Sequence, residues 1–538
     1  MRICIISQLL LVFLHSVAGF TLTTEDVQQI CGSENWTLLD LKIIQDVGDI
    51  KRLTSNKCAL NLRIPANGRL TKKVMDLLPK HHLKLLQISG ELQVLDDDSL
   101  SSLKSLKYLK LSNLNLEKSD IFKSEGKFPK HLQLLDLSHN GLNNLTFFKT
   151  ESKKMMKINV HDNHLHTVPK ELKVFGNLQE IVMNHNKIEN FSLDSTLINV
   201  VYLDVSYNII RNLSGLQHFP NLVVLNLTSN SIHEIREEYF ENERPNLQEL
   251  LLDNNFIEFI PIRILLNFPK LKIFSIANNK LRKLIPTTEN YRTTEIEYLN
   301  LGSNSLDDIP FNFLKWFPFL KTLKLNNNKL SYLRSGTFAR LNNLQHLDLS
   351  NNEIVNFNVK RLIPLESLSA LNLSNNKIEI IDYFSLALHI PNLRIINIDG
   401  NSLFCENLIE TLRFFDNNAI EVEKGKCRER EHIRDICCVD GTKNYTDLIS
   451  EGKFNMVSFS LITQNQKNSK KLDELLKTFS NATVKKESPS SMPNEGLVIT
   501  KATFWTGLGI IIAALCLILF VLLLSLFAKK KEILPVHL

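Results

Sequence analysis

One short pattern recurs through most of this 538-residue chain and constrains its fold more than any other feature. The pattern is apolar-x-x-apolar-x-apolar-x-x-Asn-x-apolar, as in the copy that runs from Leu320 to Leu330. Its Asn recurs with gaps of 22 to 25 residues at Asn140, Asn163, Asn186, Asn208, Asn230, Asn255, Asn279, Asn304, Asn328, Asn352, Asn376 and Asn401. Because a unit of this length cannot bury its apolar residues alone, neighbouring units must stack into a solenoid.

Each unit is expected to begin with a short strand. The apolar-x-apolar core of the pattern has the period of a strand whose alternate side chains point inward. A buried Asn in the turn that follows can bond backbone groups that have no ladder of their own. Two degenerate copies, with Glu91 and Leu114 in the place of Asn, bring the count to about fourteen units over residues 81–403. Outer segments such as the one at Pro310 predict extended or 3₁₀ structure rather than long helices.

These repeats resemble those of the leucine-rich-repeat family. The resemblance implies an α/β leucine-rich-repeat solenoid, a curved horseshoe with a parallel sheet on its concave side. Because the ends of a solenoid expose apolar faces, we expect an N-terminal cap over residues 20–80 and a Cys-containing C-terminal cap over residues 404–440. Within the second cap, the apolar run from Leu408 to Phe415 resembles the family's small C-terminal helix. Residues 441–503 are polar and predict a stalk.

The two ends of the chain predict its cellular address. Residues 1–19 combine Arg2, an apolar stretch and small terminal residues, which is the layout of a secretory signal peptide. Residues 504–528 carry no charge and are long enough to form one transmembrane helix. Three lysines open the tail, residues 529–538, and predict that it is cytoplasmic. We therefore expect a single-pass, type I plasma-membrane protein with an extracellular ectodomain.

Of the eight cysteines, Cys4 lies in the predicted signal peptide and Cys516 in the predicted membrane span, so six remain in the ectodomain. An even number in an exported chain predicts disulfides. The six are Cys31 and Cys58 before the repeats, and Cys405, Cys427, Cys437 and Cys438 after them. The first two are the expected N-terminal pair. Two outcomes stay open in the C-terminal cap: all four cysteines pair with one another, or Cys405 pairs with Cys427 and a remaining cysteine bridges to a second chain. A metal site is not expected, because two adjacent cysteines have the wrong spacing for zinc.

Eight Asn-x-Ser/Thr sequons would be glycosylation sites on a secretory route. They are Asn35, Asn144, Asn190, Asn212, Asn226, Asn372, Asn444 and Asn481. Asn226 and Asn372 lie between the inward apolar residues of their strands, so we expect their side chains to point out of the concave face. A glycan at either position would cover part of that face.

Neither catalysis nor nucleic-acid binding is expected. The sequence contains no nucleotide-binding loop, zinc-protease helix or nucleophile elbow, so we predict no enzyme activity and no cofactor. The net charge of +6 is small for this length and does not indicate nucleic-acid binding.

Apolar and aromatic residues gather at positions that the repeat frame directs out of the concave face. Exposed residues of this kind favour a protein interface. The candidate ligand-binding residues are Val182, Tyr202, Asp204, Tyr207, Val224 and Leu251. The alternatives are that a concave face tolerates such residues without binding a ligand, or that a glycan on Asn226 covers them.

Histidines also gather, within three consecutive units, at His131, His139, His161, His164, His166 and His185. The repeat frame places His139, His161 and His185 at outward positions near the carboxyl ends of adjacent strands. Because imidazole titrates near neutral pH, one interpretation is an acid-sensitive binding patch. The other is a set of ordinary exposed polar residues.

The family resemblance also implies a function, namely non-enzymatic recognition of a protein or other macromolecular ligand at the cell surface. Repeats followed by a Cys-Cys pair resemble the leucine-rich-repeat immune proteins described in insects, which circulate as disulfide-linked dimers. This resemblance implies innate immunity and a dimer bridged by Cys437 or Cys438. The single span and short tail resemble instead leucine-rich-repeat adhesion receptors, and a matrix-binding structural protein is a third alternative.

Overall fold

The computed structural model describes the repeats and most of the predicted caps. The described residues are 31, 36–40, 50–51, 54, 56–95, 100–116, 128–149, 151–191, 193, 196–240, 246–285, 293–428 and 432–439. All of them belong to one unit, Met1–Ile462. The predicted signal peptide (1–19), stalk (441–503), membrane span (504–528) and tail (529–538) lie outside the described residues. Within the described part, no helix is both long and apolar enough to cross a bilayer.

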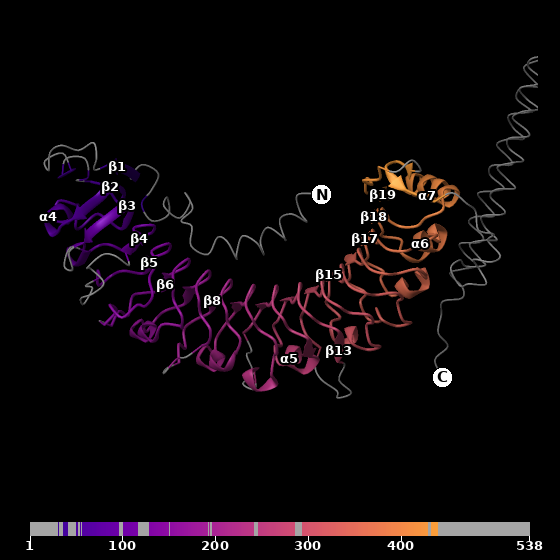
Figure 1. Cartoon of the computed structure of the whole chain (residues 1–538), viewed down its shortest axis with the longest axis horizontal. Helices are drawn as coiled ribbons and strands as arrows, with labels where there is room; N and C mark the ends of the chain where they lie inside the picture. The colour runs from indigo at the N-terminus through magenta and orange to yellow at the C-terminus, as the bar shows by residue number, and fades with distance from the viewer. Residues whose placement is uncertain are drawn as a thin grey trace, which may run out of the picture. The chain divides into compact units, whose positions relative to one another are not determined.

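One parallel sheet of seventeen strands runs through the described part of the unit. Its strands pair in chain order, from β1 with β2 to β18 with β19. They are β1 (Trp36–Asp40), β2 (Ala59–Leu70), β3 (Leu85–Leu95), β4 (Tyr108–Leu111), β5 (Leu134–Asp136), β6 (Lys157–Asn159), β7 (Glu180–Val182), β8 (Tyr202–Asp204), β9 (Val224–Asn226), β10 (Glu249–Leu251), β12 (Ile273–Ser275), β14 (Tyr298–Asn300), β15 (Thr322–Lys324), β16 (His346–Asp348), β17 (Ala370–Asn372), β18 (Ile395–Asn397) and β19 (Glu421–Val422). Figure 1 shows the strands along the inner side of the curve, so the predicted concave sheet is confirmed.

The core lies between this sheet and the outer segments, and it is continuous from unit to unit. In β15, Leu323 points inward and pairs in register with Leu299 of β14 and Leu347 of β16. All three leucines are buried. Each unit therefore stacks its inward residue directly on that of the next unit, as the repeat predicts.

The ladder asparagines bond the units to one another, as predicted. Asn328 Nδ2 donates to the carbonyl oxygens of Leu325 at 3.0 Å and Asn326 at 3.2 Å, within its own unit. It also donates to the carbonyl oxygen of Leu301 in the preceding unit at 3.0 Å. Its Oδ1 accepts a hydrogen bond from the N–H of Leu306, also in the preceding unit, at 3.0 Å. All twelve ladder asparagines are buried, and each spans the joint between two units.

The convex side consists of short segments, which confirms the expectation drawn from Pro310. The 3₁₀ helices are η1 (Leu100–Ser102), η4 (Lys170–Val174), η5 (Ser214–His218), η6 (Glu237–Phe240), η7 (Leu314–Trp316) and η8 (Val359–Leu362). The α-helices are α4 (Lys72–Met75), α5 (Ile262–Leu266), α6 (Tyr383–His389) and α7 (Cys405–Asn417), and β11 (Phe259–Pro261) pairs with β13 (Lys283–Ile285). Buried phenylalanines fill the space beneath them; Phe240 and Phe268, for example, meet edge to face at 5.3 Å.

Disulfides close both ends of the solenoid. Cys31 is bonded to Cys58, as predicted. At the other end, the predicted small helix is α7, which is followed by a hairpin of β20 (His432–Ile433) and β21 (Ile436–Cys437). The bonds there join Cys405 to Cys438 and Cys427 to Cys437, so all four cysteines pair within the chain. The alternative pairing of Cys405 with Cys427 is therefore wrong.

Candidate recognition surface

A line of mostly polar side chains crosses the concave sheet at the carboxyl ends of the strands. Asp204 of β8, for example, lies in register beside Asn226 of β9. Its Oδ1 accepts hydrogen bonds from the N–H of Ser206 at 3.0 Å and from the Ser206 hydroxyl at 2.7 Å. Asn226 bonds the N–H of Thr228 in the same way at 3.1 Å. These side chains cap the strands and satisfy the backbone of the turn.

Three of the six candidate ligand-binding residues stand in this row and are buried. Only 1% of Asp204 is accessible, and 8% each of Val182 and Leu251. Parallel strands stand only ~4.8 Å apart, so short side chains in one row bury one another. Burial also raises the pKa of Asp204, against the opposing effect of its Ser206 hydrogen bonds. These three residues belong to the sheet's own packing rather than to an accessible surface.

A second outward row stands two residues before the strand-end caps and is more accessible. Tyr202 and Val224 lie side by side in this row and are half-buried. Burial, and then the charge of Asp204, raises the pKa of the Tyr202 hydroxyl. Tyr298 stands in the same row further along, where burial raises its pKa to about 12. Both phenols are therefore neutral hydrogen-bonding groups at physiological pH.

The most exposed part of this side is a ridge formed by the residue just before each of the first eleven ladder asparagines, from Asn140 to Asn376. All of its members have left-handed backbone, with φ between 50° and 56°. The ridge residues are His139, Asp162, His185, Tyr207, Ser229, Asn254, Asn278, Ser303, Asn327, Asn351 and Asn375. The backbone N–H of each ridge residue donates to a carbonyl of the next unit, as from Tyr207 to Thr228 at 2.8 Å. A backbone ladder thus fixes the positions from which these side chains project.

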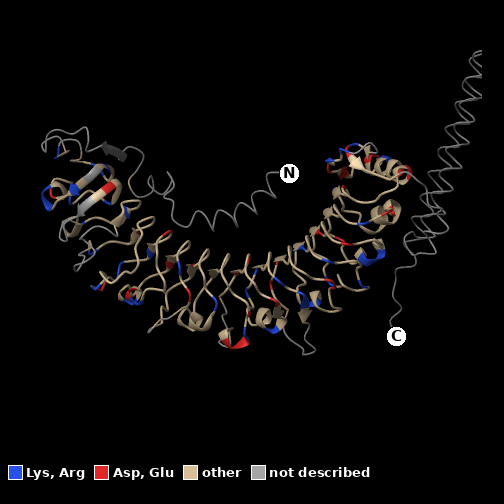
Figure 2. Ribbon diagram, in the orientation of Figure 1, with Lys and Arg blue, Asp and Glu red and all other residues tan. Residues whose placement is uncertain are grey.

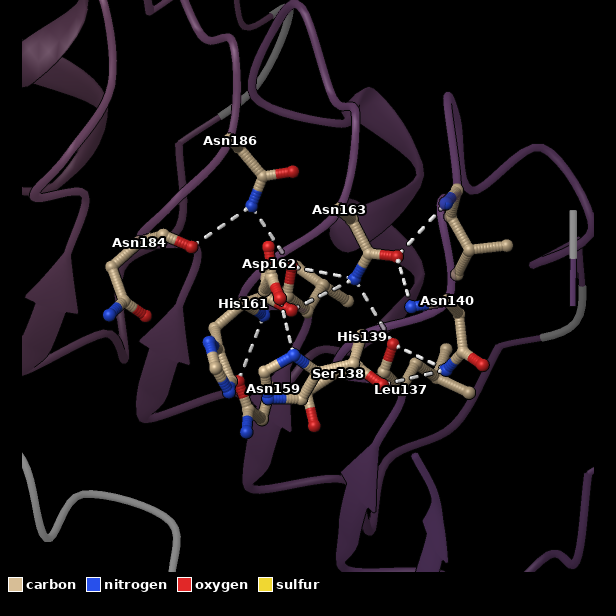
Figure 3. Close-up of polar contacts among 12 residues, drawn as sticks. Leu137, Ser138, His139, Asn140, Asn159, His161, Asp162, Asn163, Asn184 and Asn186 are labelled. Carbon is tan, nitrogen blue, oxygen red and sulfur yellow. Dashed lines mark hydrogen bonds and ion pairs between the residues drawn. The ribbon is translucent and has the colours of Figure 1, made fainter. Parts of the chain in front are cut away.

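The N-terminal part of the ridge holds a histidine cluster, which we define as His139, His161, Asp162, His185 and Tyr207. Figure 3 shows how His139, His161 and Asp162 converge from two adjacent units. His139 Nδ1 bonds the Asp162 carboxylate, and the His139 and His161 rings meet edge to face with centroids 4.2 Å apart. The His185 ring stacks on that of Tyr207, also at 4.2 Å.

The cluster confirms one part of the histidine prediction. His139, His161 and His185 do stand near the carboxyl ends of the adjacent strands β5, β6 and β7. His161 is half-buried, and burial, followed by the charge of His139, lowers its pKa. Outside the cluster, His131, His164 and His166 are exposed.

Beyond the cluster, the ridge carries amides and hydroxyls. Asn278 Nδ2 donates to Asn254 Oδ1 at 2.5 Å, and Asn254 Nδ2 donates to the Ser229 hydroxyl at 3.3 Å. Beside this run, His233 stacks with Phe256 at 5.2 Å, and the Lys280 ammonium lies 4.8 Å from the centre of the Phe256 ring. Figure 2 shows acidic and basic residues interspersed along the solenoid.

Several of these residues were missed by the sequence analysis. Asp162 and Phe256 were not selected, although each is adjacent to a ladder Asn. For Asp162 that position was the available signal, because the turn before the Asn requires left-handed backbone and so directs one side chain per unit outward. Phe256 follows its ladder Asn, and the repeat pattern gave no such signal for it. Tyr207, which was selected, lies on this ridge and is 50% exposed.

The described sequons divide by exposure. Asn144, Asn190 and Asn212 are exposed, and each follows a ladder Asn by four residues. Asn226 is only 4% exposed, and Asn372 is half-buried with its Oδ1 bonded to the N–H of Ser374 at 3.1 Å. Asn226 thus stands in the outward row beside Asp204, but its neighbours in that row bury its side chain. Asn35, Asn444 and Asn481 lie outside the described residues.

Metal binding finds no support in the described residues, where no group of three or more His, Cys, Asp or Glu side chains could hold an ion.

Comparisons with known proteins agree with this geometry. A model of the leucine rich repeat family matches residues 294–354 and 318–378. Lumican of Gallus gallus is 30% identical over 183 residues, which are 33% of this chain and 43% of lumican. Toll-like receptor 7 of Mus musculus is 27% identical over 206 residues, which are 36% of this chain and 18% of the receptor. The chain thus spans less than half the length of these relatives.

Two solved structures share the fold at low sequence identity. A chain of the Drosophila Toll–Spatzle complex has a TM-score of 0.55 and 19% identity, over 73% of this chain and 57% of that one. A leucine-rich-repeat protein of Leptospira interrogans has a TM-score of 0.50 and 21% identity, over 75% and 99%. The repeat, the ladder and the family match agree that this chain contains leucine-rich repeats stacked into a solenoid.

Proposed function

We propose that this protein is a non-enzymatic, single-pass type I cell-surface recognition protein that binds a protein ligand through its solenoid. The observation that carries the proposal is the ridge of ordered, exposed side chains beside the concave sheet. Its members project from a rigid backbone ladder, so little conformational entropy is lost when a partner contacts them. The aromatic and imidazole rings of the histidine cluster offer large contact areas at fixed positions, which is typical of interface anchors.

We propose innate immunity as the setting of this recognition. The Toll–Spatzle complex, described as a hub in Drosophila development and innate immunity, contains a chain of similar fold. One of the relatives by sequence is a Toll-like receptor. Infection should therefore raise expression of this protein. Expression confined to neural or muscle tissue, with no response to infection, would contradict the immune role and favour adhesion.

Binding through the ridge is tested with the full-length protein displayed on cells and fused outside the membrane to a proximity-labelling enzyme. Tyr207→Ala should lower labelling of the partner by about tenfold or more, because an exposed ring that anchors an interface contributes strongly to affinity. Phe319→Ala is the matched control. Phe319 is also 50% exposed, but it precedes strand β15 and so lies at the opposite edge of the sheet. Equal labelling by wild type and Tyr207→Ala, with a loss in Phe319→Ala, would overturn the assignment.

A further inference from the structure

The histidine cluster combines features that an ordinary polar surface does not need. Two imidazole rings from adjacent units touch, with centroids 4.2 Å apart, and one of them bonds a carboxylate. The Nδ1 atom of His161 is buried and finds no hydrogen-bond partner among the described residues. Its ring therefore cannot gain a proton at Nδ1 and solvate it without moving.

Titratable groups from three adjacent units surround His161. Those facing it are Asp136 and His139 from the unit of β5, Asp162 from its own unit, and His185 from the unit of β7. Of these groups, Asp136 is also paired with Lys110 at 3.5 Å. On the adjacent strands β6 and β7, Lys157 is paired with Glu180 at 2.6 Å. The charge of His139 opposes a proton on His161, because two imidazolium rings in contact repel each other.

We propose that the histidine cluster is a proton-operated part of the recognition surface, held in its observed arrangement at neutral pH and opened by acidification. His139 is held in place by its bond to Asp162, so a proton on His161, which burial and the charge of His139 oppose, drives the His161 ring away from it. His185 also faces His161 and stacks on Tyr207, so this movement changes the surface at the Tyr207 end of the cluster. A ligand seated on the neutral arrangement is then released in acid.

The direction of the stability change follows from the lowered pKa of His161. The unfolded chain, with an ordinary imidazole pKa near 6.5, binds this proton more readily than the folded protein. The contribution of neutral His161 to stability is therefore present above pH 6.5 and lost as pH falls toward its folded pKa. His346 is also half-buried with a lowered pKa, but burial is the cause and no second histidine faces it. It is a natural control.

The inference rests on the proposed function only in that a ligand contacts the ridge, and it is tested on the protein itself. The full-length chain, with ¹³C-labelled histidine, is titrated by NMR from pH 8 to pH 5. In His139→Gln, the midpoint of His161 should shift upward, toward 6.5, while the midpoint of His346 stays unchanged. An unchanged His161 midpoint in His139→Gln would overturn the coupling on which the switch depends.

Thermal melting supplies a second readout. Between pH 7.5 and pH 5.5, the melting temperature of wild type should fall further than that of His161→Asn. His131 is an exposed histidine outside the cluster, so the melting temperature of His131→Gln should fall as far as that of wild type. If the melting temperature of His161→Asn falls as far as that of wild type, the cluster is not destabilised by acid and the proposal is overturned. Failure of the proposed function would be seen separately, as unchanged partner labelling by Tyr207→Ala at neutral pH.

Discussion

At the scale of single residues, the ladder asparagines are the groups on which stacking depends. Each one satisfies backbone groups in two units at once, so its removal leaves several buried donors and acceptors without a partner. Asn328 is typical, with three carbonyls and one N–H bonded to its amide.

We expect Asn328→Ala to lower the free energy of unfolding by ~1–3 kcal/mol, because the buried backbone groups lose their partner. Chemical denaturation of the purified protein measures this change. Lys329→Ala is the control, since Lys329 is the exposed neighbour and should change stability by less than ~0.5 kcal/mol. Equal stability of the two variants would contradict the ladder.

Glycosylation should also differ between single residues. On a secretory route, peptide mass spectrometry should find glycans at Asn144, Asn190 and Asn212, which are exposed, and none at Asn226. The Asn226 side chain is buried between strands and bonds Asp204, so a sugar on its amide has no room. Each of the variants Asn144→Gln, Asn190→Gln and Asn212→Gln should lose one glycan in mass, and Asn226→Gln none. A glycan on Asn226 of the folded protein would contradict this packing.

Residue-level properties were predictable from the sequence where the repeat itself imposes them. The twelve buried asparagines follow from the pattern, because nothing else explains an amide at a fixed place among apolar residues. The burial of Asp204, Val182 and Leu251 does not follow, since the pattern gives the direction of a side chain and not the spacing of its neighbours. Only the three-dimensional register shows that adjacent rows cover one another.

At the scale of elements, the strand-end caps determine how each strand passes into its turn. Asp204 and Asn226 perform the same task in neighbouring strands, so an amide can replace the carboxylate. The carboxylate carries an additional cost, because its pKa is raised in the folded protein and the charged form is disfavoured there. Its contribution makes the protein less stable as pH rises above the unfolded value near 3.8.

We therefore expect Asp204→Asn to match or exceed wild type in melting temperature at pH 7.5, since it keeps the cap and removes the buried charge. Asp204→Ala should lower the free energy of unfolding by ~1–3 kcal/mol, because the N–H of Ser206 is left without its acceptor. Melting curves of both variants at pH 7.5 decide between them. A loss in Asp204→Asn as large as that in Asp204→Ala would show that the charge itself is required.

The C-terminal cap shows why the pairing of its cysteines could not be predicted from the sequence. Cys437 ends β21 and Cys438 follows it, and consecutive residues of extended chain point to opposite sides. One sulfur therefore reaches Cys427 and the other Cys405. The sequence excluded a bond between the two neighbours, but it could not show which side each one faces.

This pairing leads to a test of the covalent dimer. Wild type should migrate as a monomer in non-reducing electrophoresis, because Cys437 and Cys438 are both used within the chain. Cys427→Ser frees Cys437, which is half-buried, and should produce a disulfide-linked dimer. Cys427→Ser with Cys437→Ser should restore the monomer. A wild-type dimer that reduction dissolves would instead support the bridge that the insect resemblance implies.

At the scale of the whole molecule, stability is the sum of units and of the joints between them. Each strand of the sheet pairs only with its immediate neighbours in the sheet, and the side-chain amide of a ladder Asn such as Asn328 bonds its own unit and the preceding one. A repeat of this kind can lose one unit without losing the fold, provided that the register of the ladder survives.

Deletion of residues 329–352 meets that condition, because it removes 24 residues and joins Asn328 to Glu353 and Ile354 within an intact pattern. Asn328 keeps its bond from Leu306, and Ile354 keeps its bond to Asn376 Oδ1. We expect a cooperatively folded protein that has lost about a tenth of its free energy of unfolding.

Deletion of residues 329–340 removes only half a unit and is the matched control. It breaks the pattern, since the inward leucines that follow no longer stand opposite those of the preceding strand. The ladder then has no acceptor in register for the next Asn, and buried polar groups remain unpaired on both sides of the joint. We expect this variant to be retained in the cell or to unfold without a cooperative transition. If circular dichroism and secretion showed the two deletions to fold equally well, stability would have to come from single units rather than from the register between them.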